Sequence, residues 1–108
     1  MAADHRAQAG KIWPILVEVA TAKGKMTYGE LGPRVGVFYR NLNLPLDLIA
    51  RHCKRNGLPP LTVVIVNADT DEPGPGFLDG DDVAGAFTKV YEHDWAAVKN
   101  PFALFLTT

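Results

Sequence analysis

The feature that most restricts the fold of this 108-residue chain is the shortness of its apolar runs, the longest of which have about six residues, as at residues 61–66. A transmembrane helix needs roughly 20 apolar residues, so a run this short excludes a membrane-spanning helix. The run is rich in β-branched side chains and almost wholly apolar, which predicts a strand that is buried on both faces. We therefore expect a folded globular chain with a clear strand at residues 61–66 and no membrane contact.

The length and composition indicate a single domain over residues 1–108, because 47% hydrophobic residues is ordinary for a folded protein. A chain of this size buries roughly two-thirds of its unfolded surface, so it needs no metal or disulfide to hold a core. Its one cysteine, Cys53, and the lack of a visible secretory signal favour a cytoplasmic location. Residues 1–10 lack large apolar groups, and we expect a frayed or partly helical tail there.

Hydrophobic periodicity predicts two helices in the first third of the chain. The first covers about residues 12–23, with Pro14 in its first turn; a longer helix that is kinked at Pro14 is the alternative. The second covers about residues 28–35. It follows Thr27 and Glu30, which have the spacing of a capping box.

A third helix is predicted over about residues 44–56, capped by Asn43 and ended by Gly57. Its inward stripe consists of Leu46, Ile49, Ala50 and Cys53. Residues 67–76 are rich in turn formers, and Phe77 begins a returning strand. A fourth helix is expected over residues 83–93.

This order of elements is that of a winged helix-turn-helix. The expected fold is α+β: three helices, a β-hairpin and a C-terminal helix. In that arrangement residues 67–76 form the wing, and the helix over residues 44–56 is the second helix of the helix-turn-helix pair.

The formal net charge of −1 hides an asymmetry between the two parts of the chain. Residues 1–57 hold nine Lys or Arg and four acids, whereas residues 58–108 hold two Lys and eight acids. Such a split favours an anionic partner on the basic side. Two oppositely charged, solvated faces that attract each other within one fold are the alternative.

The third helix carries the strongest functional signal. Arg51, Lys54 and Arg55 cluster beside its apolar stripe, as in a helix that neutralises phosphates and contacts guanine. Further backbone contacts are expected from Lys23, Lys25 and Arg34. Cations near a helix C-terminus are also explained by the helix dipole. The acidic wing and Asp47, near the start of the helix, argue instead for a protein partner.

Residues 26–31, Met-Thr-Tyr-Gly-Glu-Leu, resemble a helix start in the DNA-binding domain of alkylguanine-DNA alkyltransferases and alkyltransferase-like proteins. That resemblance implies a shared winged-helix framework. The family carries a Pro-Cys-His-Arg motif after its third helix, where this chain has Pro59-Pro60-Leu61-Thr62. The resemblance therefore implies neither alkyl transfer nor lesion binding.

No set of acid, base and nucleophile is visible, so we expect neither an enzyme nor a cofactor. Cys53 lies on the apolar stripe and is interpreted as structural, although His52 is its neighbour. The acids from Asp69 onward do not form a calcium-binding loop. In a loop that starts at Asp69, two of the ligand positions are occupied by Pro73 and Gly80, so no metal is expected.

The leading hypothesis is a small, non-enzymatic winged-helix protein that binds double-stranded DNA as a regulator or accessory factor. The alternative is a protein-interaction module, such as an adaptor, inhibitor or immunity-type protein. It would dock the acidic residues 67–82 on a basic partner. The sequence leaves open whether the chain forms a homodimer.

Overall fold

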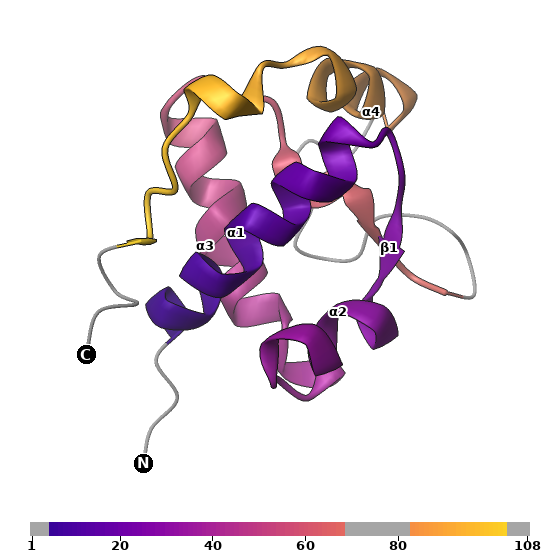
Figure 1. The fold of residues 1–108 in the computed structure, drawn as a ribbon, viewed down its shortest axis with the longest axis vertical. Helices are drawn as coiled ribbons and strands as arrows, with labels where there is room; N and C mark the ends of the chain where they lie inside the picture. Colours follow the sequence, from indigo (N-terminus) through magenta and orange to yellow (C-terminus); the bar gives the residue numbers. More distant parts are fainter. Residues whose placement is uncertain (1–4, 69–82, 104–108) are drawn as a thin grey trace.

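The computed structural model describes residues 5–68 and 83–103, which form four α-helices and a two-stranded parallel sheet (Figure 1). The elements in chain order are α1 (His5–Thr21), β1 (Met26–Thr27), α2 (Tyr28–Val35), η1 (Tyr39–Asn41), α3 (Asn43–Arg55), η2 (Leu61–Val64), β2 (Ile65–Val66), α4 (Val83–Glu92) and η3 (Trp95–Ala97), where η marks a 3₁₀ turn. The predicted α+β class and its four helices are confirmed. No helix of the described residues is long and apolar enough to cross a membrane.

The first helix is longer than its main predicted range and contains Pro14, as in the alternative. It begins at His5, so residues 5–10 are helical and Ala9 and Gly10 are buried. Pro14 has no N–H for the carbonyl of Gly10, which is the usual helical acceptor. The side-chain amide of Asn100 donates to that carbonyl instead, at 2.8 Å. A residue from the far end of the chain therefore satisfies the acceptor that the proline leaves.

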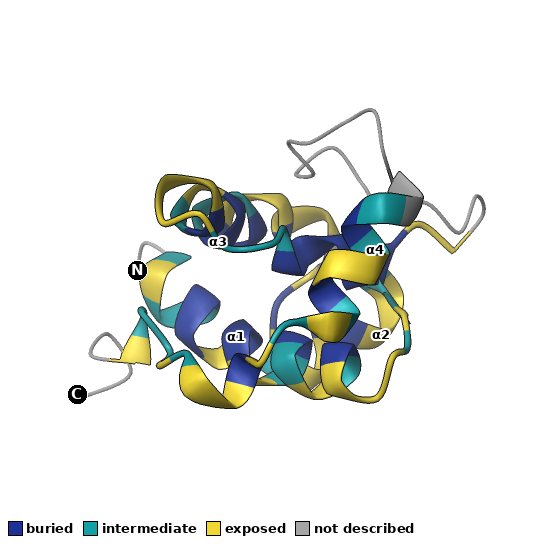
Figure 2. Ribbon diagram, turned by 90° about the horizontal axis from the view of Figure 1, so that it is seen from above, coloured by how far each residue is buried: buried dark blue, intermediate teal, exposed yellow. Residues whose placement is uncertain are grey.

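The core lies between α1 and α3, with η2 and α4 against it. Figure 2 shows that the buried sides of α1 and α3 are turned toward the interior and their exposed sides toward solvent. Trp13 of α1 and Trp95 of η3 meet edge to face, with ring centroids 5.9 Å apart. The Trp95 indole N–H donates to the Val90 carbonyl at 2.8 Å, so this large side chain is buried without an unpaired donor.

The predicted β-hairpin is wrong for the described strands. β2 pairs in parallel with β1, with Met26 opposite Ile65 and Thr27 opposite Val66. Only the last two residues of the apolar run 61–66 form a strand, and Leu61–Val64 form η2 instead. All six residues are buried, as expected. A short apolar run indicates burial, but it does not distinguish a strand from a buried helical turn.

Several expectations lie outside the described residues. Apart from Asn67 and Ala68, these are the predicted wing 67–76, the returning strand at Phe77 and the acidic edge 67–82. At the chain end the structure describes Phe102, which packs against the core.

Candidate nucleic-acid interface

The predicted helix-turn-helix pair corresponds to α2 and α3, which are joined by residues 36–42. The start of α2 is fixed by the predicted capping box. Thr27 Oγ1 accepts from the Glu30 N–H at 3.1 Å, and the Thr27 N–H donates to Glu30 Oε1 at 3.0 Å. The helix ends at Gly36, whose left-handed φ of 71° suits a residue without a side chain. Both boundaries of the first helix in the pair are therefore set locally.

The start of α3 differs from the prediction. Asn43 is the first helical residue; the N-cap is Leu42, and no side chain caps the helix. The C-terminal end of α3 agrees with the prediction that Gly57 ends the helix. Gly57 has a φ of 69°, and the Leu58 N–H donates to the Cys53 carbonyl at 2.8 Å, as in a Schellman motif. The predicted inward stripe is confirmed, since all of its members are buried: Leu46, Ile49, Ala50 and Cys53.

The opposite side of α3 is its outer face, which we define as Leu44, Arg51 and Arg55. These residues recur at i, i+7 and i+11, so they share one side of the helix, and all three are exposed. Lys54, exposed as well, lies on an adjacent side. The outer face is therefore apolar at the start of the helix and cationic in its last two turns.

Asp47 modifies this face, because its carboxylate is engaged by one of the cations. Arg51 Nε lies 2.7 Å from Asp47 Oδ2, which is a helical i, i+4 ion pair. The side chain of Arg51 remains 67% exposed, so the pair is open to solvent. Exposed pairs of this kind contribute at most about 0.5 kcal/mol to stability. Arg51 can therefore exchange its partner at little cost.

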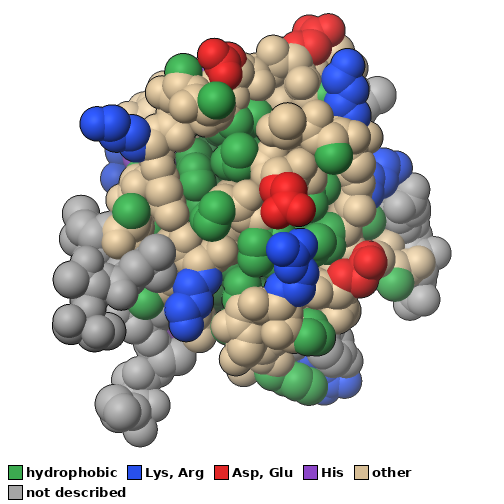
Figure 3. Space-filling model, viewed as in Figure 1, with side chains coloured by type: hydrophobic (Ala, Val, Ile, Leu, Met, Phe, Trp, Pro, Cys, Tyr) green, Lys and Arg blue, Asp and Glu red, His purple; other side chains and the backbone are tan. Residues whose placement is uncertain are grey.

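The other predicted contacts, Lys23, Lys25 and Arg34, do not join the outer face. Lys23 and Lys25 follow the C-terminal end of α1, and Lys25 Nζ lies 5.0 Å from the ring centroid of Phe87 in α4. That end of α1 lies across the molecule from the C-terminal end of α3 (Figure 1). Arg34, in the last turn of α2, lies 3.8 Å from Glu18 of α1. On the side of the molecule that is drawn in Figure 3, Lys and Arg side chains are dispersed among acidic and apolar ones.

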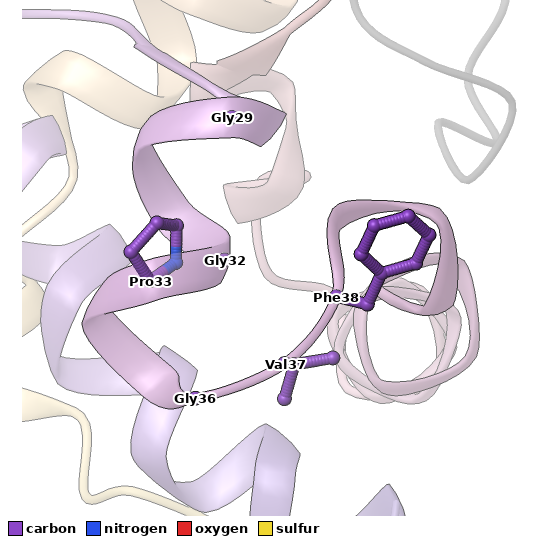
Figure 4. A pocket seen from close by; sticks show the side chains of 6 residues that line it. All are labelled: Gly29, Gly32, Pro33, Gly36, Val37 and Phe38. Carbon is purple, nitrogen blue, oxygen red and sulfur yellow. The ribbon is translucent and has the colours of Figure 1, made fainter.

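Sequence reasoning missed two exposed apolar side chains near the start of α3. Phe38 is 60% exposed and Leu44 is 55% exposed. Phe38 also lines a pocket of about 250 Å³ with Val37 and the glycine-rich side of α2 (Figure 4). The other lining residues are Gly29, Gly32, Pro33 and Gly36. A signal for Leu44 was present in the sequence, because its helical position falls opposite the apolar stripe.

Cys53 and His52 are adjacent in sequence but lie in different surroundings. Cys53 is completely buried, and burial raises the pKa of its thiol, although a hydrogen bond with the Leu61 backbone acts in the opposite direction. His52 is half-buried, with its ring edge to face with Trp13 and Phe102. Burial and the nearby Arg55 lower the pKa of His52. Cys53 thus belongs to the core, whereas His52 lies at its edge between two aromatic rings.

Comparison of the chain with protein-family models, with curated proteins and with solved structures gives no match.

Proposed function

We propose that the α2–α3 pair binds double-stranded DNA with the outer face of α3 toward the duplex. In this proposal the protein is a regulator or accessory factor that performs no chemistry on the DNA. The observation that carries the proposal is the group of three exposed cations in the last two turns of α3: Arg51, Lys54 and Arg55. Cations so placed neutralise phosphates and release counterions.

The charge distribution along the chain supports the same partner. Residues 1–57, which include α2 and α3, hold nine Lys or Arg and four acids. Residues 58–108 hold two Lys and eight acids, six of them in residues 69–82. A basic segment that includes α3 attracts a polyanion. The alternative, a protein-interaction module that uses the acidic residues, rests on residues 69–82 alone.

The helix-turn-helix order gives the orientation. In such pairs the first helix crosses the DNA backbone, and the second enters the major groove with its N-terminal residues toward the bases. Here α3 would insert its first turn, while Arg51, Lys54 and Arg55 contact phosphates along the groove. Its buried stripe anchors α3 on α1 and leaves the outer face exposed.

The test is fluorescence anisotropy with a labelled duplex, titrated at several salt concentrations between roughly 50 and 200 mM. The test variant is Lys54→Ala with Arg55→Ala, which leaves the Asp47–Arg51 ion pair in place. The matched control is Lys11→Ala with Lys89→Ala, which removes two exposed positive charges from α1 and α4. Circular dichroism checks that both variants fold.

We expect the wild-type affinity to fall steeply with salt. The slope of log K against log salt should decrease by about one for each phosphate contact that is lost. The test variant should therefore show a shallower slope than the control variant. No wild-type binding at the lowest salt, or equal slopes for the two variants, would overturn the proposal.

A further inference from the structure

Phe38 and Leu44 are the large hydrophobic residues that are exposed in the part of the chain the structure describes. Phe38 lies in the connection before α3, and Leu44 is the second residue of the helix. Apolar side chains add nothing to the binding of phosphates. Leu44, at the start of the outer face, would therefore make a different kind of contact.

The neighbour of Leu44 has a complementary chemistry. Asn43 is exposed at the first position of α3, directly after the N-cap residue Leu42. An amide side chain can pair with adenine N6 and N7 at once, which makes it the usual reader of adenine in the major groove. An apolar side chain meets the C5-methyl group of thymine. One apolar and one amide side chain in the same turn therefore match the groups that the two bases of an A·T pair present in the major groove.

We propose that α3 reads A·T base pairs in the major groove, with Leu44 against a thymine methyl group and Asn43 on adenine. This inference rests on the proposed DNA binding and adds a sequence preference to it. The first turn of the second helix is the part of a helix-turn-helix pair that reaches base edges. The cations further along the same helix hold the backbone and give no sequence preference of their own.

Charge complementarity favours DNA over a protein partner at this surface. The α3 helix carries Arg51, Lys54 and Arg55 against one acid, Asp47, which is paired with Arg51. The exposed apolar side chain of Leu44 is thus on the same helix as these cations. A protein that covered Leu44 would have to be acidic beside an apolar contact, whereas DNA supplies both the phosphates and the methyl groups.

The experiment compares three duplexes of equal length: alternating A–T, the same duplex with deoxyuridine in place of thymidine, and alternating G–C. Deoxyuridine removes only the C5-methyl group. The proteins are the wild type, Leu44→Ala, and Lys54→Ala with Arg55→Ala. Because Leu44 is exposed, Leu44→Ala is expected to fold normally, and circular dichroism verifies this. A second arm replaces adenine by 7-deazaadenine, which lacks the N7 acceptor, and tests Asn43→Ala.

We expect the wild type to prefer the thymidine duplex over the deoxyuridine duplex by about four-fold for each methyl group buried. Leu44→Ala should lose that preference, and the Lys54 and Arg55 variant should bind both duplexes more weakly while keeping it. Asn43→Ala should no longer distinguish adenine from 7-deazaadenine.

The outcomes separate this inference from the proposed function. Equal wild-type affinity for the thymidine and deoxyuridine duplexes, with normal salt dependence, would overturn the A·T reading and leave DNA binding intact. Absence of any duplex binding would overturn both. A third outcome is that Phe38→Ala and Leu44→Ala leave DNA binding unchanged but abolish self-association or the capture of a protein. In that case Phe38 and Leu44 form a protein-docking surface, and the inference is wrong.

Discussion

The side-chain amide of Asn100 donates a 2.8 Å hydrogen bond to the carbonyl oxygen of Gly10, ninety residues earlier in the chain. This bond satisfies the acceptor that Pro14 leaves without its helical donor. It also ties the C-terminal segment to the N-terminal half of α1. Asn100 Oδ1 in turn accepts from the Phe102 N–H at 3.0 Å, so one side chain fixes both the helix and the segment that follows.

This relationship predicts a strong coupling between Asn100 and Pro14. Asn100→Ala should destabilise the wild type by about 1 to 2 kcal/mol, because the part-buried Gly10 carbonyl loses its partner. In a Pro14→Ala background the alanine supplies the missing N–H, so the same substitution should cost clearly less. Urea unfolding of the four proteins of the double-mutant cycle measures the difference. Asn100→Ala also removes the hydrogen bond with the Phe102 N–H, but it does so with either residue at position 14, so this loss cancels in the cycle. An equal loss of stability in both backgrounds would contradict the interpretation.

Under the proposed DNA binding, the Asp47–Arg51 ion pair predicts a variant of higher affinity for the duplex. Asp47→Asn removes a negative charge from beside the outer face and frees Arg51 for a phosphate. Affinity for duplex DNA should rise, and the salt slope should steepen by about one. Stability should change by less than about 0.5 kcal/mol. Anisotropy titrations and thermal unfolding measure the two effects.

The control for Asp47→Asn is Glu92→Gln, which removes one exposed acid from α4. The control should leave the slope unchanged, because α4 lies away from α3 (Figure 1). If both variants gain affinity equally, net charge alone explains the effect and the outer face has no special role.

Lys23 occupies a position that favours glycine. Its φ of 55° is left-handed, and its N–H and that of Gly24 close a Schellman motif at the end of α1, donating to the carbonyls of Ala20 and Val19. A residue with a side chain loses about 1 to 2 kcal/mol in this left-handed conformation, and glycine avoids that cost. Glycine also gives the unfolded chain more conformational freedom, which offsets part of the gain, so Lys23→Gly should stabilise the protein by about 0.5 to 1 kcal/mol. Chemical denaturation measures the gain. Lys25→Gly, outside the motif, should not be stabilising.

His52 predicts a pH dependence of stability. Its pKa is lowered in the folded protein, so the unfolded chain binds the proton more readily. The stabilising contribution of neutral His52 is present above the ordinary histidine pKa of about 6.5 and is lost as the pH falls through the folded value. His52→Phe keeps a ring between Trp13 and Phe102 and should be less sensitive to acid.

The measurement for His52 is the free energy of unfolding between about pH 7.5 and pH 5. The wild type should lose more stability than His52→Phe over this range. The other described histidines, His5 and His93, remain in both proteins and supply the common background. Parallel curves for the two proteins would contradict the prediction, because they would show that protonation of His52 does not affect the free energy of unfolding.

Much of the fold was predictable because its signals are local. The capping box at Thr27 and Glu30, the end of α3 at Gly57 and the inward stripe of α3 each depend on residues within one or two turns. The range of α1 was predicted only as an alternative, since the hydrogen bond from Asn100 that replaces the one missing at Pro14 could not be foreseen. That compensation is a tertiary contact without any sequence pattern.

The site was predictable in part for the same reason. Helical spacing placed Arg51, Lys54 and Arg55 together, and the structure keeps them together and exposed. Lys23, Lys25 and Arg34 were grouped with them by charge alone, although they lie on other elements. The parallel pairing of residues 65–66 with residues 26–27 was also missed, because strand partners this far apart leave no mark on local composition.

The pairing of β1 with β2 has a consequence for how the helix pair is attached. The chain leaves the sheet at Thr27 and returns to it at Ile65, opposite Met26, so both ends of the intervening segment are anchored about 5 Å apart. The α2–α3 pair therefore lies in a loop that the sheet closes. The ends of this loop cannot separate unless the pairing of β1 with β2 is broken.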